Sequence, residues 1–280
     1  MIPELIFAIF FGLLLLGIHR KIIARIQGRP GPPVWQEILH MLKFGGKKTW
    51  IPVTAGKSLF AGLIVIELGI WTTGFIVLFT GGNLIIIFGI YIFDKIVEYG
   101  LGLSSGSPYG KFAGARSIIS AMSEVPLFVS IAGIVIFTHT LLLNGISDYQ
   151  LSHSPLFIIA FPAAVAMFLV ILAKMPSGPF SAVEGKEFIS GCRTEHFGVF
   201  RAALMISDGL KIFVLLSTFI VVFFGITAII PVIILMVLLI VILAFVCAFT
   251  PVLSPYDSVS IEMLVTGCSL AYFVILGVFL

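Results

Sequence analysis

The chain has 280 residues, of which 60% are hydrophobic and only 10% are charged. This composition, with a mean hydropathy of +1.21, excludes an ordinary soluble domain. The formal net charge of +3 does not favour nucleic-acid binding, because membrane topology accounts for the basic residues. The three cysteines (Cys192, Cys247 and Cys268) form no CxxC pair, so we expect neither a disulfide framework nor iron–sulfur ligands here.

Long apolar segments predict an all-α polytopic membrane protein, built as a single membrane domain over residues 1–280. About 20 apolar residues in a helix are needed to cross the hydrocarbon core. The first segment reads as a retained helix rather than a cleaved signal peptide, because Glu4 precedes it and Arg20 and Lys21 follow it. The eight predicted spans are 2–18, 58–80, 84–103, 116–143, 155–174, 199–224, 227–250 and 259–280.

Lysine and arginine residues occupy alternate connections between these spans, and the intervening connections have none. The positive-inside rule therefore predicts a multi-pass protein of the cell membrane with its N-terminus outside. Two of the cytoplasmic connections are long, at residues 19–57 and 175–198. The first should contain an amphipathic helix over residues 34–44 that lies along the membrane surface, either as an anchor or as the roof of a site. The second has mixed charges and should be an ordered loop that faces other proteins.

Carboxylates recur inside the apolar spans, all of them at mid-membrane depth or nearer the cytoplasmic side: Glu67, Asp94, Glu98, Glu124, Asp208 and Glu262. An unpaired carboxylate in hydrocarbon costs several kcal/mol, so such residues usually face a protein interior or a water-filled path. Their distribution predicts a half-channel that leads from the cytoplasm to mid-membrane and then sideways into a partner. The alternative is a set of structural carboxylates paired with Lys95, Lys211 or a buried hydroxyl, including a pair between Asp208 and Lys211 on one helix face.

Several motifs in the cytoplasmic connections resemble the subunit-1/H family of respiratory complex I, which includes the equivalent subunits of energy-converting membrane-bound hydrogenases. They are the run 25–36, Ser105–Tyr109, Ser123-Glu124-Val125, Pro179-Phe180 with Glu184 and Glu187, and Thr194–Gly198. The compact Gly-Pro-Pro-x-x-Gln segment at 31–36 resembles the hydrogenase-like branch. His40 and Ser181 stand where the family commonly has aspartate, and Asp208 where it has glutamate, which leaves open a sulfur-reducing relative.

The resemblance implies a membrane-arm coupling subunit of a redox-driven ion pump of the hydrogenase, sulfur-reductase or quinone-oxidoreductase type. The chain itself would carry no catalytic residue, metal or redox centre. Its partners would be the lipid bilayer, antiporter-like membrane subunits, and soluble hydrogenase-like subunits on the cytoplasmic side. Those soluble subunits would hold iron–sulfur clusters and, in a hydrogenase, a nickel–iron centre. The alternatives are a stand-alone secondary ion transporter or channel and a passive membrane anchor, although no internal repeat relates the two halves of the chain.

Two sets of candidate residues follow from the buried charges and from the resemblance. The expected proton or ion path comprises Glu67, Asp94, Glu98, Glu124, Glu195, Asp208, Lys211 and Glu262. The expected interface or cavity beneath the redox module comprises Arg25, Arg29, Gln36, His40, Glu184, Glu187 and Arg193. Carboxylates suit such a path because burial and nearby cations shift their proton affinity in opposite directions.

Overall fold

A computed structural model describes residues 1–121, 125–181 and 191–279, and in these ranges the regular secondary structure is helical. The helices are α1 (Ile2–Ile26), α2 (Gln36–Gly45), α3 (Lys57–Phe79), α4 (Leu84–Ser104), α5 (Pro108–Ala121), α6 (Val125–Thr138), α7 (Leu143–Ser152), α8 (Leu156–Ile159), α9 (Phe161–Ala173), α11 (Val199–Phe224), α12 (Ile229–Phe249) and α13 (Pro255–Phe279). The prediction of an all-α membrane fold is confirmed.

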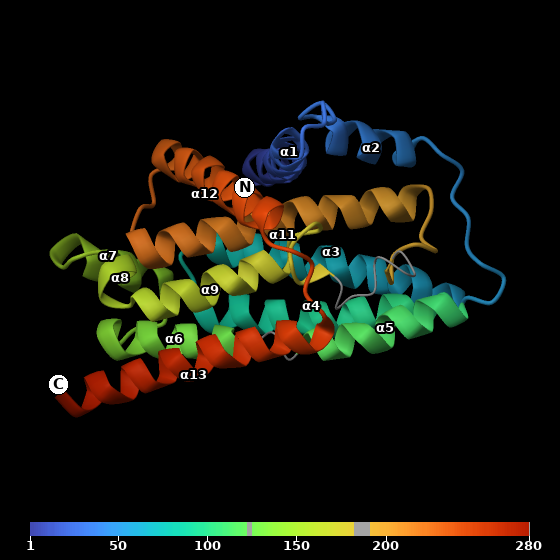
Figure 1. Cartoon of the computed structure of the whole chain (residues 1–280). Coiled ribbons are helices and arrows are strands. Elements are labelled where there is room, and N and C mark those ends of the chain that lie inside the picture. Colours follow the sequence, from blue (N-terminus) through green and yellow to red (C-terminus); the bar gives the residue numbers. More distant parts are fainter. Residues whose placement is uncertain (122–124, 182–190, 280) are drawn as a thin grey trace.

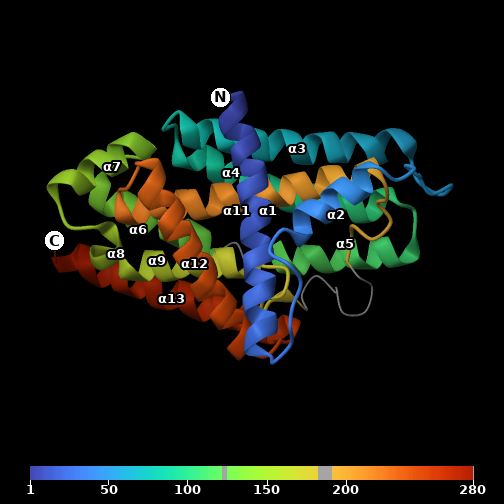
Figure 2. The ribbon, with the colours of Figure 1, turned by 90° about the horizontal axis from the view of Figure 1, so that it is seen from above.

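Most of the long helices lie along one common axis. Helix α11 lies among them, and most of its residues are buried (Figure 1). Seen from above, α1 crosses this bundle steeply, and α12 is also oblique to it (Figure 2). Residues 27–35 connect α1 to α2. Helix α2 lies beside both α1 and α11. The crossing helix α1 and the surface helix α2 together cover one side of α11.

Five helices in the described ranges are long and apolar enough to span a membrane: α1, α3, α11, α12 and α13. Shorter or more polar helices account for other predicted spans within the described ranges. Helix α4 has 21 residues but contains Asp94, Lys95 and Glu98, and α6 and α9 are apolar but shorter. The predicted span 155–174 divides at Ala160 into α8 and α9, where Pro162 lacks the N–H that would continue the helix.

The predicted amphipathic helix at 34–44 corresponds to α2, which begins two residues later. Its buried side packs through Met41 against Leu13 of α1 and Met205 of α11. An ion pair between Arg20 and Glu37 also joins α1 to α2. The apolar side chains on the other side of α2 stay exposed, namely Trp35, Leu39 and Leu42. Helix α2 therefore has apolar residues toward the bundle as well as away from it.

Helix α1 crosses α11 at a pair of glycines. A Cβ atom at Gly12 would lie 2.0 Å from the carbonyl oxygen of Gly209, and one at Gly209 would lie 2.9 Å from the carbonyl oxygen of Ile9. At Gly17, a Cβ would lie 1.8 Å from the carbonyl oxygen of Val34. Small residues allow such close approach of helix backbones in membrane proteins. These glycines determine where α1 lies across the bundle.

We predict that Gly12→Val lowers the stability of the protein, because its side chain must displace the backbone of α11. Overpacking of this kind costs about 1–3 kcal/mol, which thermal unfolding of the detergent-solubilised protein can detect. The control is Gly69→Ala, because a Cβ at Gly69 would meet no atom within 4 Å. Equal melting temperatures for the two variants would contradict a close crossing at Gly12.

Candidate functional site

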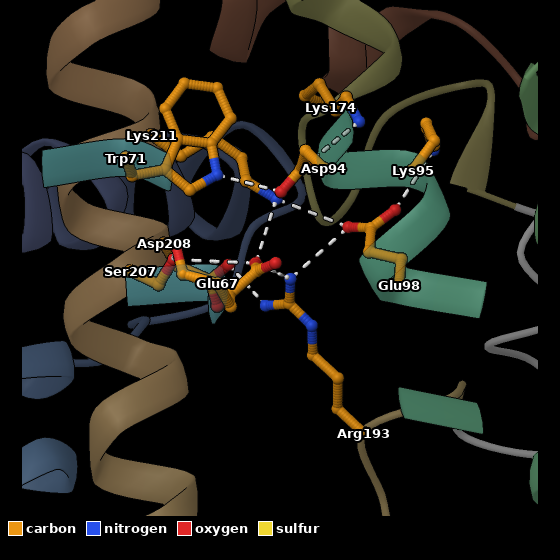
Figure 3. Close-up of polar contacts among 10 residues, drawn as sticks. All are labelled: Glu67, Trp71, Asp94, Lys95, Glu98, Lys174, Arg193, Ser207, Asp208 and Lys211. Carbon is orange, nitrogen blue, oxygen red and sulfur yellow. Dashed lines mark hydrogen bonds and ion pairs between the residues drawn. The ribbon is translucent and has the colours of Figure 1, made fainter. Parts of the chain in front are cut away.

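Four carboxylates and four cations form a connected group of ion pairs in the interior of the bundle (Figure 3). We call this group the charge cluster. Its formal charges cancel, which removes much of the cost of placing charge in the membrane interior. Its members are Glu67 of α3, Asp94, Lys95 and Glu98 of α4, Lys174 after α9, Arg193 of the segment 191–198, and Asp208 and Lys211 of α11.

Asp94 is the most completely bonded carboxylate of the charge cluster. Its side chain is fully buried, and it accepts a hydrogen bond of 2.8 Å from Trp71 Nε1. The Lys174 and Lys211 ammonium groups lie 3.0 and 2.9 Å from its Oδ2. Two cations and an indole therefore hold this carboxylate in place.

Lys211 joins α11 to α3 and α4. Besides Asp94, its Nζ lies 3.3 Å from Glu98 Oε1 and 3.7 Å from Glu67 Oε1. Lys211 thus turns toward these helices rather than pairing with Asp208 one turn before it, the pairing that the spacing suggested. Within α4, Lys95 Nζ lies 3.2 Å from Glu98 Oε2 and closes an ion pair one turn apart.

Arg193 is the cluster member contributed by the segment before α11, outside the helices. Its Nη2 lies 3.0 Å from Glu67 Oε1 and 3.3 Å from Glu98 Oε1, and its Nη1 pairs with Asp208. One guanidinium group therefore contacts carboxylates from α3, α4 and α11. Burial by itself disfavours the charge, but Asp208, Glu67 and Glu98 outweigh it and hold the pKa of Arg193 well above its usual value.

Two glycines at the ends of the segment 191–198 allow Arg193 to reach inward. Gly191 and Gly198 have φ angles of +84° and +66°, in the left-handed region that side chains disfavour. A Cβ at Gly198 would lie 2.7 Å from the Cα of Thr49, so the end of this segment lies directly against the connection from α2. The aromatic rings of Phe44 and Phe197 also meet there at 5.7 Å.

A cavity of about 500 Å³ adjoins the charge cluster. Five cluster residues form its charged wall: Glu98, Lys174, Arg193, Asp208 and Lys211. Leu13 and Leu16 of α1 and Met205 and Ile212 of α11 are the main apolar residues that line it. Arg20, Glu37 and Arg201 line it as well. The cavity thus combines a polar side suited to water or a polar ligand with an apolar side.

The structure brings five of the eight expected ion-path residues together: Glu67, Asp94, Glu98, Asp208 and Lys211. Arg193, which the sequence places at the redox-module interface, joins them. Glu195 is partly exposed in the segment before α11. Glu262 is buried on α13 but forms none of the cluster's ion pairs. Glu124, like the loop residues Glu184 and Glu187, lies outside the described residues.

The other expected interface residues lie away from the cavity wall. Arg25 in the last turn of α1 and Arg29 just after that helix are exposed, and the side chain of Gln36 lies 2.7 Å from His40 Nε2 on α2. None of these four lines the cavity.

Three residues that belong to the charge cluster or donate a hydrogen bond to it were not predicted from the sequence: Lys174, Trp71 and Ser207. In the sequence analysis, Lys174 served only as a positive charge that indicates membrane topology. In the structure, its side chain directly follows an apolar helix and is almost fully buried. Trp71 lies four residues after Glu67, and this spacing places both on one helix face. The Ser207 hydroxyl, 3.4 Å from Glu67 Oε1, has no distinguishing signal in the sequence.

Comparison with known proteins finds similarity over nearly the whole chain. The family model described as NADH dehydrogenase matches residues 2–276. A protein of Methanocaldococcus jannaschii, provisionally named an NADH-ubiquinone oxidoreductase, is 45% identical over 279 residues, covering 97% of this chain and 95% of the relative. The chain belongs to the NADH dehydrogenase family, that of the subunit-1/H proteins of complex I. It is therefore a membrane subunit of a redox-driven complex.

More distant relatives share the family or the fold. The H subunit of the NADH-quinone oxidoreductase of Bacillus cytotoxicus is 30% identical over 254 residues, which cover 78% of this chain and 75% of that protein. A chain of the membrane-bound sulfane sulfur reductase, an archaeal respiratory membrane complex, superposes with a TM-score of 0.85. That match covers 96% of both chains at 22% identity and so establishes a common fold.

No group of three or more histidine, cysteine, aspartate or glutamate side chains that could hold a metal ion occurs within the described ranges. The charge cluster instead satisfies its carboxylates with lysine and arginine.

We predict that Arg193→Gln destabilises the protein by about 3 kcal/mol or more, because it removes from the interior a cation that three carboxylates share. Denaturant unfolding of the purified protein measures the change. Arg193→Lys should be intermediate, since one ammonium group cannot replace the planar fork that contacts three carboxylates. The control is the exposed Arg25→Gln, and a loss of the same size in this control would argue against the cluster as the cause.

His196 provides a pH-dependent test of the same segment. Its ring is buried and stacks on Phe60 at 4.2 Å between centroids. Burial lowers the pKa of His196 to about 4, and the positive charges of Arg193 and Arg201 contribute to this shift. The folded state therefore binds this proton less well than the unfolded state, and stability should fall as the pH drops from about 6.5 toward 4.

We predict that His196→Phe, which retains a ring against Phe60, removes this part of the acid sensitivity. Melting temperatures measured for both proteins between pH 4 and pH 7 should diverge as the pH falls. Parallel profiles would show that the buried imidazole does not contribute.

Proposed function

We propose that this membrane protein couples electron transfer in docked soluble subunits to outward translocation of H⁺ or Na⁺. The soluble partners would carry the iron–sulfur clusters, and in a hydrogenase the nickel–iron centre, on the cytoplasmic side of the cell membrane. Antiporter-like membrane subunits would receive the signal laterally, with the N-terminus of this chain outside. Family membership supports a place in such a complex.

The observation that carries this proposal is the reach of Arg193 from the segment before α11 to carboxylates on three helices. An opposite charge within about 4–6 Å favours the ionised form of a carboxylate. A displacement of the segment 191–198 that withdrew Arg193 would therefore promote proton uptake by Glu67, Glu98 or Asp208. Its return would expel the proton.

The remaining members of the charge cluster make this response collective. Lys211 contacts Glu67, Asp94 and Glu98, so a change in protonation of one carboxylate alters the interaction of the lysine with the others. Closely spaced groups of this kind titrate as a coupled set. We propose that Glu124, Glu195 and Glu262 extend the path beyond the cluster, with Glu184 and Glu187 at the redox-module interface beside Arg25, Arg29, Gln36 and His40.

The type of complex is inferred from the two long cytoplasmic connections. The compact segment 31–36 favours the hydrogenase-like branch over the quinone-reducing enzymes. His40 and Ser181 in place of aspartates remove two carboxylates expected in a quinone cavity. We therefore propose a hydrogenase-like complex or its sulfur-reducing relative. Co-purification in mild detergent, followed by analysis of iron, nickel and sulfide, distinguishes the two, because nickel is expected in the hydrogenase. A metal-free, solitary chain that transports ions in liposomes would instead establish a transporter.

We predict that Glu67→Gln uncouples the complex, because the amide preserves the shape of the side chain but cannot bind the proton. In liposomes containing the purified complex, the number of ions translocated per electron should fall, because the path loses an ionisable group. Electron transfer with the gradient collapsed should remain near the wild-type rate. The control is Glu4→Gln, an exposed residue beside the amino terminus. An unchanged ion-to-electron ratio would remove Glu67 from the path.

A further inference from the structure

Arg201, the third residue of α11, lines the cavity and forms no ion pair or hydrogen bond with a described residue, although Asp208 and Glu37 attract its charge from beyond ion-pair distance. No carboxylate in this part of the chain forms an ion pair with its guanidinium, and no acceptor takes a hydrogen bond from it. The other cations on the cavity wall are each paired: Arg20 with Glu37, Lys174 and Lys211 with Asp94, and Arg193 with Asp208.

A count of formal charge gives the same result. The eight residues of the charge cluster are neutral as a group, and the pair of Arg20 and Glu37 is also neutral. Arg201 is then the surplus positive charge at the cavity. A guanidinium that is partly withdrawn from water and unpaired favours a bound anion, and its planar fork suits carboxylates and phosphates best.

The apolar side of the cavity indicates what is attached to that anion. On α1, Leu13 and Leu16 lie on one face with Arg20, at spacings of three and four residues. On α11, Met205 and Ile212 share a face with Arg201. On both helices, the arginine thus lies at the end of the cavity beside Glu37 of α2. The apolar side chains lie farther along each helix, away from that end. Ile212, eleven residues beyond Arg201, lies about 16 Å farther along α11.

We propose that this cavity binds the phosphate group of a membrane phospholipid at Arg201, with the first part of its chain against Leu13, Leu16 and Met205. The order of cation and apolar residues along both helices matches the order of headgroup and chain in a phospholipid. Arginines near the ends of membrane helices extend to the depth where such phosphates lie. A volume of about 500 Å³ is within the range of small-molecule pockets.

The test is the phospholipid content of the purified complex. After extensive washing in mild detergent, extraction and mass spectrometry should find about one fewer retained phospholipid per copy of this chain in Arg201→Gln. Arg201→Lys, which keeps the charge without the fork, should retain an intermediate amount. The matched control is Lys111→Gln, because it removes an exposed positive charge of α5 outside the cavity.

Further arms separate the sources of the anion. Delipidated complex placed in nanodiscs of phosphatidylglycerol should regain the lipid in an Arg201-dependent manner. Equal lipid content in wild type and Arg201→Gln would overturn the proposal. So would binding of inorganic phosphate at Arg201 that excludes the lipid, since the ligand would then be a free anion. Loss of a partner protein from Arg201→Gln without loss of lipid would likewise overturn it, by assigning the anion to a carboxylate of that partner.

Discussion

The cost of placing charge inside a membrane is the constraint on which the rest of this structure depends. Isolated ions in hydrocarbon are unstable, and the charge cluster meets this constraint by matching four carboxylates with four cations. The helices that supply them must therefore meet at one place. Helix α11 provides the centre, since Lys211 contacts groups from both α3 and α4.

In the function proposed above, such matching also makes the site responsive. Most of the cations are attached to the bundle, but Arg193 belongs to a segment between glycines with left-handed backbone angles. A movement of that segment changes the balance of charge inside the membrane without moving any helix. The device is electrostatic, because withdrawal of one cation leaves several carboxylates to redistribute protons among themselves.

The cavity beside the cluster exists because α1 crosses the bundle instead of joining it. Gly12 and Gly209 bring the two backbones into contact at the crossing, and the helices diverge toward the end covered by α2. Glycine at the crossing and longer side chains beyond it thus produce both the tight contact and the open volume lined by Leu16 and Met205. A charged wall and an apolar wall meet there, which distinguishes this space from a simple ion path.

Hydropathy and composition were sufficient for the helical membrane fold, since apolar length is a local property of the chain. They did not locate the interruptions within individual spans. Pro162 divides one apolar segment, and the charges of α4 interrupt another, so length alone misjudges how each helix is accommodated. Glu67, Asp94 and Glu98 were identified correctly as interior groups, because their cost in lipid does not depend on their partners.

By itself, the sequence determined the class of protein, the family motifs, and the set of ionisable residues that must be satisfied somewhere in the membrane. Only the tertiary structure decided the pairing. Lys211 turned from Asp208 toward Asp94 and Glu98, Lys174 proved to be a member of the cluster, and Arg201 was left without an ion pair among the described residues. The physical reason is that ion pairing depends on distances of a few ångströms between helices far apart in sequence, which no local pattern records.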